Sequence, residues 1–272
     1  HGDCDHSARI TAVSIVDEIQ FWMSKDFRTF GIMDDSFNQD PVRAKEICRL
    51  IIDRKLGIKW DLYNGLRANK FDREQALLLK QSGCTFIGFG MESGNEAMLK
   101  KIGKGLTKAD LERAVVLANE AGINTYVNFI LGHPGETYAT ALETLNYAAH
   151  LPCSYVNIYS LIPIPGTRAY DELKKTATFF YDEDYYLSHF GTQTTEPVFE
   201  TPELNRDQRR TLYRMGRNLC KRSILQFRLG RIPGYFAYLL LRNEMLFKLG
   251  HALRETEWGK RLYQRIRREQ NT

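Results

Sequence analysis

Five points in the chain place polar or charged side chains directly after a run of apolar residues. They are Asp34 with Asp35, Arg67, Glu92, residues 132–137 and residues 163–167. Carboxylates bind amines and hydroxyl groups, and a guanidinium binds a carboxylate through two parallel hydrogen bonds. This set of residue types suits a ligand that carries an amine, a carboxylate and a ribose.

Each of these groups also has a simpler structural interpretation. The aspartates and Glu92 can cap the helices that follow them, and the Gly-Pro segments are typical of tight turns. Arg67 can pair with Asp61 or Asp72. The interpretation as a ligand site rests on the joint arrangement, because all five groups follow predicted strands.

Other ligand motifs are incomplete in the sequence. The run from Gly88 to Ser93 resembles a dinucleotide fingerprint, and Asp110 follows about 20 residues on, but Ser93 replaces the third glycine. No GxxxxGK[ST] phosphate loop is present, and His133 stands alone beside a proline, which favours a loop residue over a metal ligand. The five cysteines show no metal or redox spacing, which favours small buried residues; they are Cys4, Cys48, Cys84, Cys153 and Cys220.

The elements that must position these groups alternate between strands and helices. Short runs rich in Ile, Val, Phe and Tyr predict buried strands, at 28–33, 58–63, 85–90, 125–131 and 155–162. Helix signals fill the intervals. Asp40 before a proline predicts an N-cap, Thr107 with Asp110 predicts a capping box, and Gly122 predicts a helix end.

Repeated strand–helix units of about 30 residues predict an α/β fold with a parallel sheet. Periodicity leaves open whether the sheet closes into a barrel or stays doubly wound. In both cases ligands bind beyond the carboxyl ends of the strands. A helix at 14–25 precedes the first predicted strand and the polar residues 1–9 predict no strand before it, so we expect the fold to lack its first strand.

The last part of the chain has a different character. We predict a linker with an aromatic segment at 176–203, followed by a helical extension at 204–272 with helices near 204–228, 235–250 and 255–269. The extension holds 17 Lys and Arg against 5 Asp and Glu, whereas the rest of the chain holds 21 against 28. Basic amphipathic helices are typical of membrane surfaces and acidic partners. The alternative is that these helices pack on the acidic body with solvated charges, and the pattern ranks nucleic acid last.

No apolar run approaches the ~20 residues of a membrane span, and no signal-peptide pattern follows His1. We therefore expect a cytoplasmic protein that associates with membranes only peripherally, if at all. The membrane surface and a lipid-like or other small-molecule substrate are the predicted partners.

Four motifs, in order, resemble one enzyme family. They are FGIMDDSFNQDPVRAKEICRLII at 30–52, GFGMESGNEAMLKKIGKG at 88–105, AGINTYVNFILGHPGET at 121–137 and LIPIPGTRAY at 161–170. They resemble the second, fourth, fifth and sixth strand regions of radical S-adenosylmethionine (SAM) enzymes, in the branch associated with a cobalamin-binding domain. The resemblance covers about residues 8–175.

The resemblance implies a partial (β/α)6 barrel, similar to a TIM barrel, over residues 1–175, with SAM bound across the strand tips. Carried over by position, Asp34 and Asp35 would approach the methionyl amine, and Arg67 the methionyl carboxylate. Glu92 would bind the ribose. Ile130 and Gly132 would lie against the adenine, and the turn that begins at Pro163 would close the rim.

The family's CxxxCxxC loop, which holds a [4Fe-4S] cluster, is absent from this sequence. We expect its three cysteines upstream of His1, and the alternative is a barrel that has lost its cluster. With the cluster, the resemblance implies that reduction of SAM yields a 5′-deoxyadenosyl radical that modifies an unactivated C–H position, by methylation or rearrangement. Cobalamin would be held by an N-terminal domain. The competing functions are a SAM- or partner-binding barrel without catalysis and an interaction protein at a membrane surface.

Overall fold

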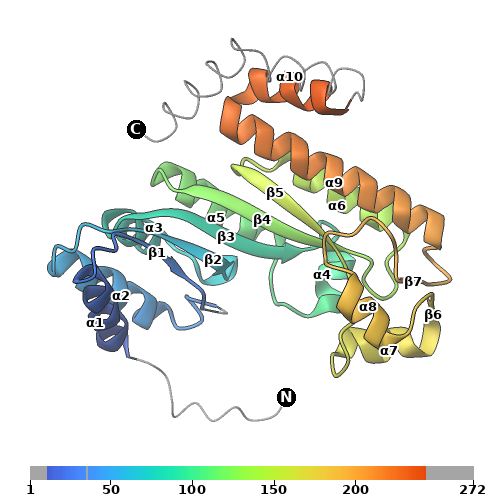
Figure 1. Cartoon of the computed structure of the whole chain (residues 1–272), viewed down its shortest axis with the longest axis horizontal. Coiled ribbons are helices and arrows are strands. Elements are labelled where there is room, and N and C mark those ends of the chain that lie inside the picture. Colours follow the sequence, from blue (N-terminus) through green and yellow to red (C-terminus); the bar gives the residue numbers. More distant parts are fainter. Residues whose placement is uncertain (1–10, 35, 243–272) are drawn as a thin grey trace. The chain divides into compact units, whose positions relative to one another are not determined.

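A five-stranded parallel sheet forms the centre of the chain (Figure 1). The computed structural model describes residues 11–34 and 36–242. The strands are β1 (Thr29–Ile32), β2 (Lys59–Leu66), β3 (Cys84–Glu92), β4 (Asn124–Leu131) and β5 (Tyr155–Ser160). Each overlaps a predicted strand, which confirms the α/β class.

The strands lie side by side in chain order, β1-β2-β3-β4-β5. A doubly wound sheet reverses its strand order at a switch point, whereas a barrel wall adds each strand beside the last. The observed order is therefore that of a barrel wall, which decides the alternative that periodicity left open.

The helices begin and end largely where the sequence signals predicted. Asp40 accepts hydrogen bonds from the backbone nitrogens of Val42 (3.0 Å) and Arg43 (3.2 Å), Thr107 and Asp110 form the capping box, and Gly122 takes a φ of 72°. The helices around the sheet are α1 (Ala12–Met23), α2 (Pro41–Asp53), the 3-10 turn η2 (Ala68–Lys70), α3 (Arg73–Gln81), α4 (Glu96–Ile102), α5 (Lys108–Glu120) and α6 (Tyr138–His150).

The two faces of the sheet differ in composition. On β3, Ile87, Phe89 and Met91 point into the helix-covered core and have no exposed surface. The alternate residues point to the opposite face, which we call the open face, because successive strand residues alternate between faces. On the open face β3 carries Gly88 and Gly90. These residues have no side chains, so β3 projects little from this face, whereas large side chains cover the core face.

Residues 176–203, for which the sequence predicted a linker, contain three short elements after α7 (Arg168–Thr176). They are β6 (Thr178–Phe179), α8 (Glu183–His189) and β7 (Phe199–Glu200). β6 and β7 pair in an antiparallel manner. Leu173, Tyr186, Val198 and Phe199 form a second buried cluster there, so the aromatic residues of the segment build a small core of their own.

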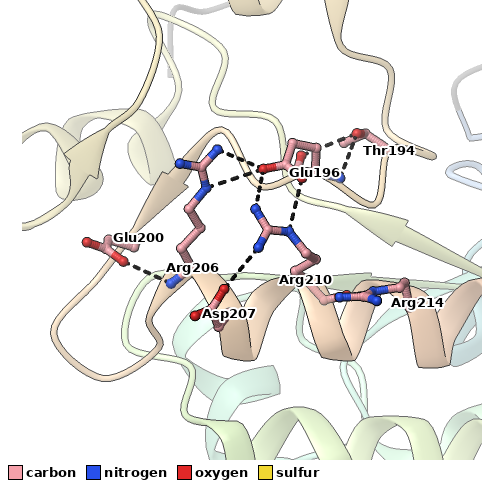
Figure 2. A network of polar contacts seen from close by, with 7 residues as sticks. All are labelled: Thr194, Glu196, Glu200, Arg206, Asp207, Arg210 and Arg214. Carbon is pink, nitrogen blue, oxygen red and sulfur yellow. Dashed lines mark hydrogen bonds and ion pairs between the residues drawn. The ribbon is translucent and has the colours of Figure 1, made fainter.

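A network around Glu196 joins this segment to α9 (Arg206–Leu229), as Figure 2 shows. The Glu196 carboxylate accepts from Arg206 (2.8 Å) and from Arg210 (2.7 Å). The hydrogen bonds from Arg210 and Arg206 hold the pKa of Glu196 down at about 2. Two of the basic residues of the predicted extension therefore have carboxylate partners within the fold.

The chain divides into two compact units, residues 1–220 and 221–272, and α9 crosses the boundary. In the first unit α9 covers the outer edge of β5. A Cβ on Gly216 would lie 2.6 Å from Ile158, and the Ile158 N–H donates to the sulfur of Cys220 (3.0 Å). In the second unit α10 spans Arg231–Arg242, and the predicted helix at 255–269 lies outside the described residues.

Across the described ranges, no helix combines the length and the apolar character that a membrane crossing requires. The predicted domain boundaries at 175 and 203 stay predictions.

Candidate functional site

Glu92 ends β3 in an unusual backbone conformation. Its φ is 72°, and the pairing of β3 with β4 is irregular between Gly90 and Glu92. A residue other than glycine pays about 1–3 kcal/mol for such a conformation, and strain of this kind gathers at functional sites. The irregularity directs the side chain back along the strand.

The Glu92 carboxylate lies above Gly90 on the open face. A Cβ on Gly90 would lie 3.0 Å from Oε1 of Glu92 and 2.7 Å from Nζ of Lys104. Lys104 forms an ion pair with Glu92 Oε1 and donates to the Gly90 carbonyl (3.2 Å). A side chain at position 90 would displace this pair from its present arrangement.

Lys104 is brought to Glu92 by the loop between α4 and α5. Nη2 of Arg67 donates to the Lys104 carbonyl (2.8 Å), and Asn69 donates to the Gly105 carbonyl (2.9 Å). Asn38 fixes the Arg67 backbone by accepting from its N–H (2.7 Å) and donating to its carbonyl (3.0 Å). The loop is therefore anchored at two points, to Arg67 directly after β2 and to Asn69 in η2.

Arg67 does not pair with Asp61 or Asp72. Asp72 accepts from Lys45 (2.7 Å), and Asp61 accepts from the hydroxyl of Thr85 (2.5 Å). Nε of Arg67 is buried and has no hydrogen-bond partner among the described residues. One donor of this guanidinium thus has no partner among the described residues.

A row of polar side chains crosses the open face beside Gly90. Gly90 pairs with Asn128, which pairs with Asn157, and the Asn157 amide donates to the Asn128 amide oxygen (3.0 Å). In the next row Ile130 lies beside Tyr159. All four β4 and β5 side chains are half-buried, so they form a surface that a ligand can reach.

Aromatic rings form the floor below that row. Phe86, Tyr126 and Tyr155 stack with centroid distances of 5.5–5.7 Å. The Tyr126 hydroxyl donates to the Tyr63 carbonyl, and burial raises the pKa of Tyr126. The Tyr126 hydroxyl is therefore protonated at neutral pH and is committed to the backbone.

Beyond Ile130, Gly132 begins a buried polar cluster. Its N–H donates to the carboxylate of Glu136, and its carbonyl accepts from Arg209 (3.4 Å), which has no exposed surface. Burial raises the pKa of Glu136 to about 7, against the opposing effects of the Gly132 N–H and the Arg209 charge. Burial likewise lowers the pKa of His133 to about 4, so this imidazole is neutral at pH 7.

The structure brings some of the predicted site residues together and leaves others apart. Glu92, Ile130 and Gly132 lie at the adjoining ends of β3 and β4, and Arg67 reaches them through the Lys104 loop. Asp34, at the end of β1, forms an ion pair with Arg43 (3.4 Å). Asp35 lies outside the described residues.

Pro163 is buried next to α8, where its carbonyl accepts from the hydroxyl of Tyr186 (2.8 Å). Sequence reasoning missed Lys104, Asn128, Asn157 and Arg209. The glycines on both sides of Lys104 were a usable signal, since they mark a sharply turned loop. The asparagines alternate with core residues on their strands, which also marks them as facing away from the core.

The described residues hold no group of three His, Cys, Asp or Glu side chains that could bind a metal ion. Their four cysteines form no disulfide, and burial raises the pKa of each thiol, to about 12 for Cys48 and Cys153. These thiols do not fit an iron–sulfur cluster. The arrangement at Glu92 fits instead a ligand with hydroxyl groups, for which it offers carboxylate and amide oxygens.

Comparison with known proteins gives a consistent result. Residues 5–148 match the Radical SAM superfamily. The chain is 33% identical over 139 residues to an uncharacterized methyltransferase of Pyrococcus horikoshii, a match that covers 51% of this chain and 30% of that protein. It is 29% identical over 189 residues to the anaerobic magnesium-protoporphyrin IX monomethyl ester cyclase of Cereibacter sphaeroides, covering 67% and 30%.

Among solved structures, the chain is similar to the radical S-adenosylmethionine methyltransferase TsrM from Kitasatospora setae, with cobalamin and a [4Fe-4S] cluster bound. The TM-score is 0.58 at 23% identity, covering 64% of this chain and 35% of TsrM. The chain thus spans about a third of the length of these relatives, and the likeness to TsrM shows the fold.

Proposed function

The chain belongs to the radical SAM superfamily, and from that premise we propose that the open face at Glu92 binds the adenosyl group of SAM. The observation that carries the proposal is the Glu92 carboxylate, held above Gly90 with one oxygen on Lys104. A pair of ribose hydroxyls needs an acceptor of this kind, and a charged acceptor binds a hydroxyl about twice as strongly as a neutral one.

The other site residues take roles that follow from their positions. Ile130 and Gly132 would hold the adenine, and the Pro163 turn would close the rim on the β5 side. Arg67 would receive the methionyl carboxylate, which requires its buried, unpartnered Nε to become accessible to the ligand. Asp34, which follows β1, would receive the methionyl amine together with its sequence neighbour Asp35, which requires Asp34 to exchange Arg43 for the ligand.

For the whole protein we propose radical SAM catalysis on a small molecule, at an unactivated C–H position, by methylation or rearrangement. SAM, a [4Fe-4S] cluster and cobalamin are the proposed cofactors. The methyltransferase and cyclase relatives support this range of reactions, and TsrM binds both metal cofactors. When bound and reduced by one electron, SAM supplies a radical that abstracts hydrogen. The described residues would orient the adenosyl group and exclude water.

Replacing Glu92 by glutamine tests the site. We expect the dissociation constant of SAM, measured by titration calorimetry with the chain, to rise about tenfold, because a charged acceptor becomes a neutral one. Glu96→Gln, at an exposed position four residues away, is the matched control and should bind as the unchanged chain does. Equal affinities in all three proteins would reject Glu92 as a ligand-binding residue.

Attachment to a membrane surface is a second proposal, which rests on α10 alone. This helix exposes 69% of Ile232, 61% of Phe236 and 52% of Leu241 between Arg231 and Arg242. Such an apolar face flanked by basic residues suits an anionic bilayer. We expect the chain to sediment with vesicles rich in phosphatidylglycerol and Phe236→Ser to reduce the bound fraction several-fold. Equal sedimentation of both proteins, or of neither, would count against the proposal.

A further inference from the structure

We infer that Lys104 is a positioning residue that fixes the Glu92 carboxylate for the hydroxyl groups of the ligand. The inference rests on the proposed function, because it concerns how the same site recognises ribose. Lys104 holds only Oε1 of Glu92. In the part of the chain that the structure describes, the second oxygen, Oε2, makes no hydrogen bond, so it stays available as an acceptor.

The backbone conformation of the loop around Lys104 directs the lysine side chain toward Glu92. Gly103 and Gly105 take positive φ values of 77° and 63°, and a Cβ on either would meet nothing within 4 Å. These glycines therefore serve the backbone conformation and not close packing. They turn the loop so that the Lys104 side chain points down to Gly90 while its carbonyl faces Arg67.

The Lys104 ammonium restricts the arrangements that the Glu92 carboxylate can adopt. Glu92 sits in a strained backbone conformation, and an unrestrained glutamate side chain has three rotatable bonds to populate. The double contact of Lys104 with the Gly90 carbonyl and with Oε1 selects one of these arrangements. Preorganisation of this kind lowers the entropic cost of binding, so its loss appears as lower affinity.

Loss of the contact between Lys104 and Glu92 should leave the stability of the fold nearly unchanged. Glu92 is 15% exposed and Lys104 is 38% exposed in their side chains, and the loop keeps its anchors to Arg67 and Asn69 when only the Lys104 side chain is changed, since both anchors use backbone carbonyls. A Lys104→Met chain should therefore unfold at nearly the same temperature as the unchanged chain.

The test measures binding of S-adenosylhomocysteine and of its 2′,3′-dideoxy counterpart by titration calorimetry. We expect Lys104→Met to raise the dissociation constant of S-adenosylhomocysteine about tenfold and that of the dideoxy probe less than twofold. The dideoxy probe has no ribose 2′- or 3′-hydroxyl group for Glu92 to bind. Lys104→Arg should restore most of the affinity. Lys100→Met, at an exposed position on α4, is the matched control.

The outcomes separate the two proposals. If Glu92→Gln leaves both probes unaffected, the proposed function at this site fails. If Glu92→Gln weakens S-adenosylhomocysteine but Lys104→Met does not, only the role of Lys104 is overturned. A Lys104→Met chain that loses both probes equally would also overturn it, since that result indicates a general structural defect.

Discussion

Replacing Arg209 by methionine is expected to lower the free energy of unfolding by about 3–5 kcal/mol. Arg209 is fully buried and donates to the carbonyls of Leu204 (3.0 Å) and Gly132 (3.4 Å) and to the hydroxyl of Thr201 (3.2 Å). Its guanidinium also lies 4.1 Å over the ring of Phe199. Methionine fills much of the volume but removes all three donated hydrogen bonds and leaves the Gly132 carbonyl without this donor, whereas the Leu204 carbonyl keeps the backbone N–H of Thr201 (3.1 Å).

Urea denaturation followed by tryptophan fluorescence measures this change. Arg214→Met is the matched control, because Arg214 lies on the same helix, is exposed and donates only to the Arg210 carbonyl (3.3 Å). A surface substitution of this kind should stay within about 0.5 kcal/mol. Similar losses for both variants would mean that the Arg209 cluster contributes little to the fold.

Replacing Glu136 by glutamine is expected to stabilise the chain increasingly as pH rises. Burial raises the pKa of Glu136 in the folded state to about 7, from 4.5. Below pH 4.5 the carboxyl is protonated in both states and carries no penalty. Between 4.5 and 7 the unfolded state loses the proton and the folded state keeps it, so stability falls by about 1.4 kcal/mol per pH unit.

The free energy of unfolding of Glu136→Gln should therefore rise relative to that of the unchanged chain by roughly 3 kcal/mol from pH 4.5 to pH 8. Glutamine cannot ionise and resembles the protonated acid in shape. Urea midpoints measured at four pH values would follow the difference, with the exposed Glu18→Gln on α1 as control. Parallel stability curves for the two proteins would contradict a raised pKa at Glu136.

The strands of the sheet could be predicted from the sequence because each is a short apolar run without the periodicity of a helix. The caps at Asp40 and Thr107 were also predictable, since a cap depends on residues three or four positions apart. Strand order was not, because it depends on which elements pack together. Only the observed pairing shows that β1 to β5 lie side by side in sequence order.

The site was only partly predictable for a related reason. Glu92 and Gly132 follow strands and could be found from their neighbours in sequence. Lys104 lies 12 residues after Glu92 and meets it only because the α4–α5 loop folds back. Arg209 is one of many basic residues in a segment that the sequence assigned to solvent or to a membrane, and only tertiary packing marks it as buried.

The contact between Ile158 and Cys220 has a consequence for self-association. A sheet edge with free N–H and carbonyl groups is a template for strands of other molecules. At β5 the helix α9 covers that edge, and a thiol receives an N–H that a neighbouring strand would otherwise take. Growth of this sheet by addition of a strand from another molecule is therefore blocked at the β5 edge.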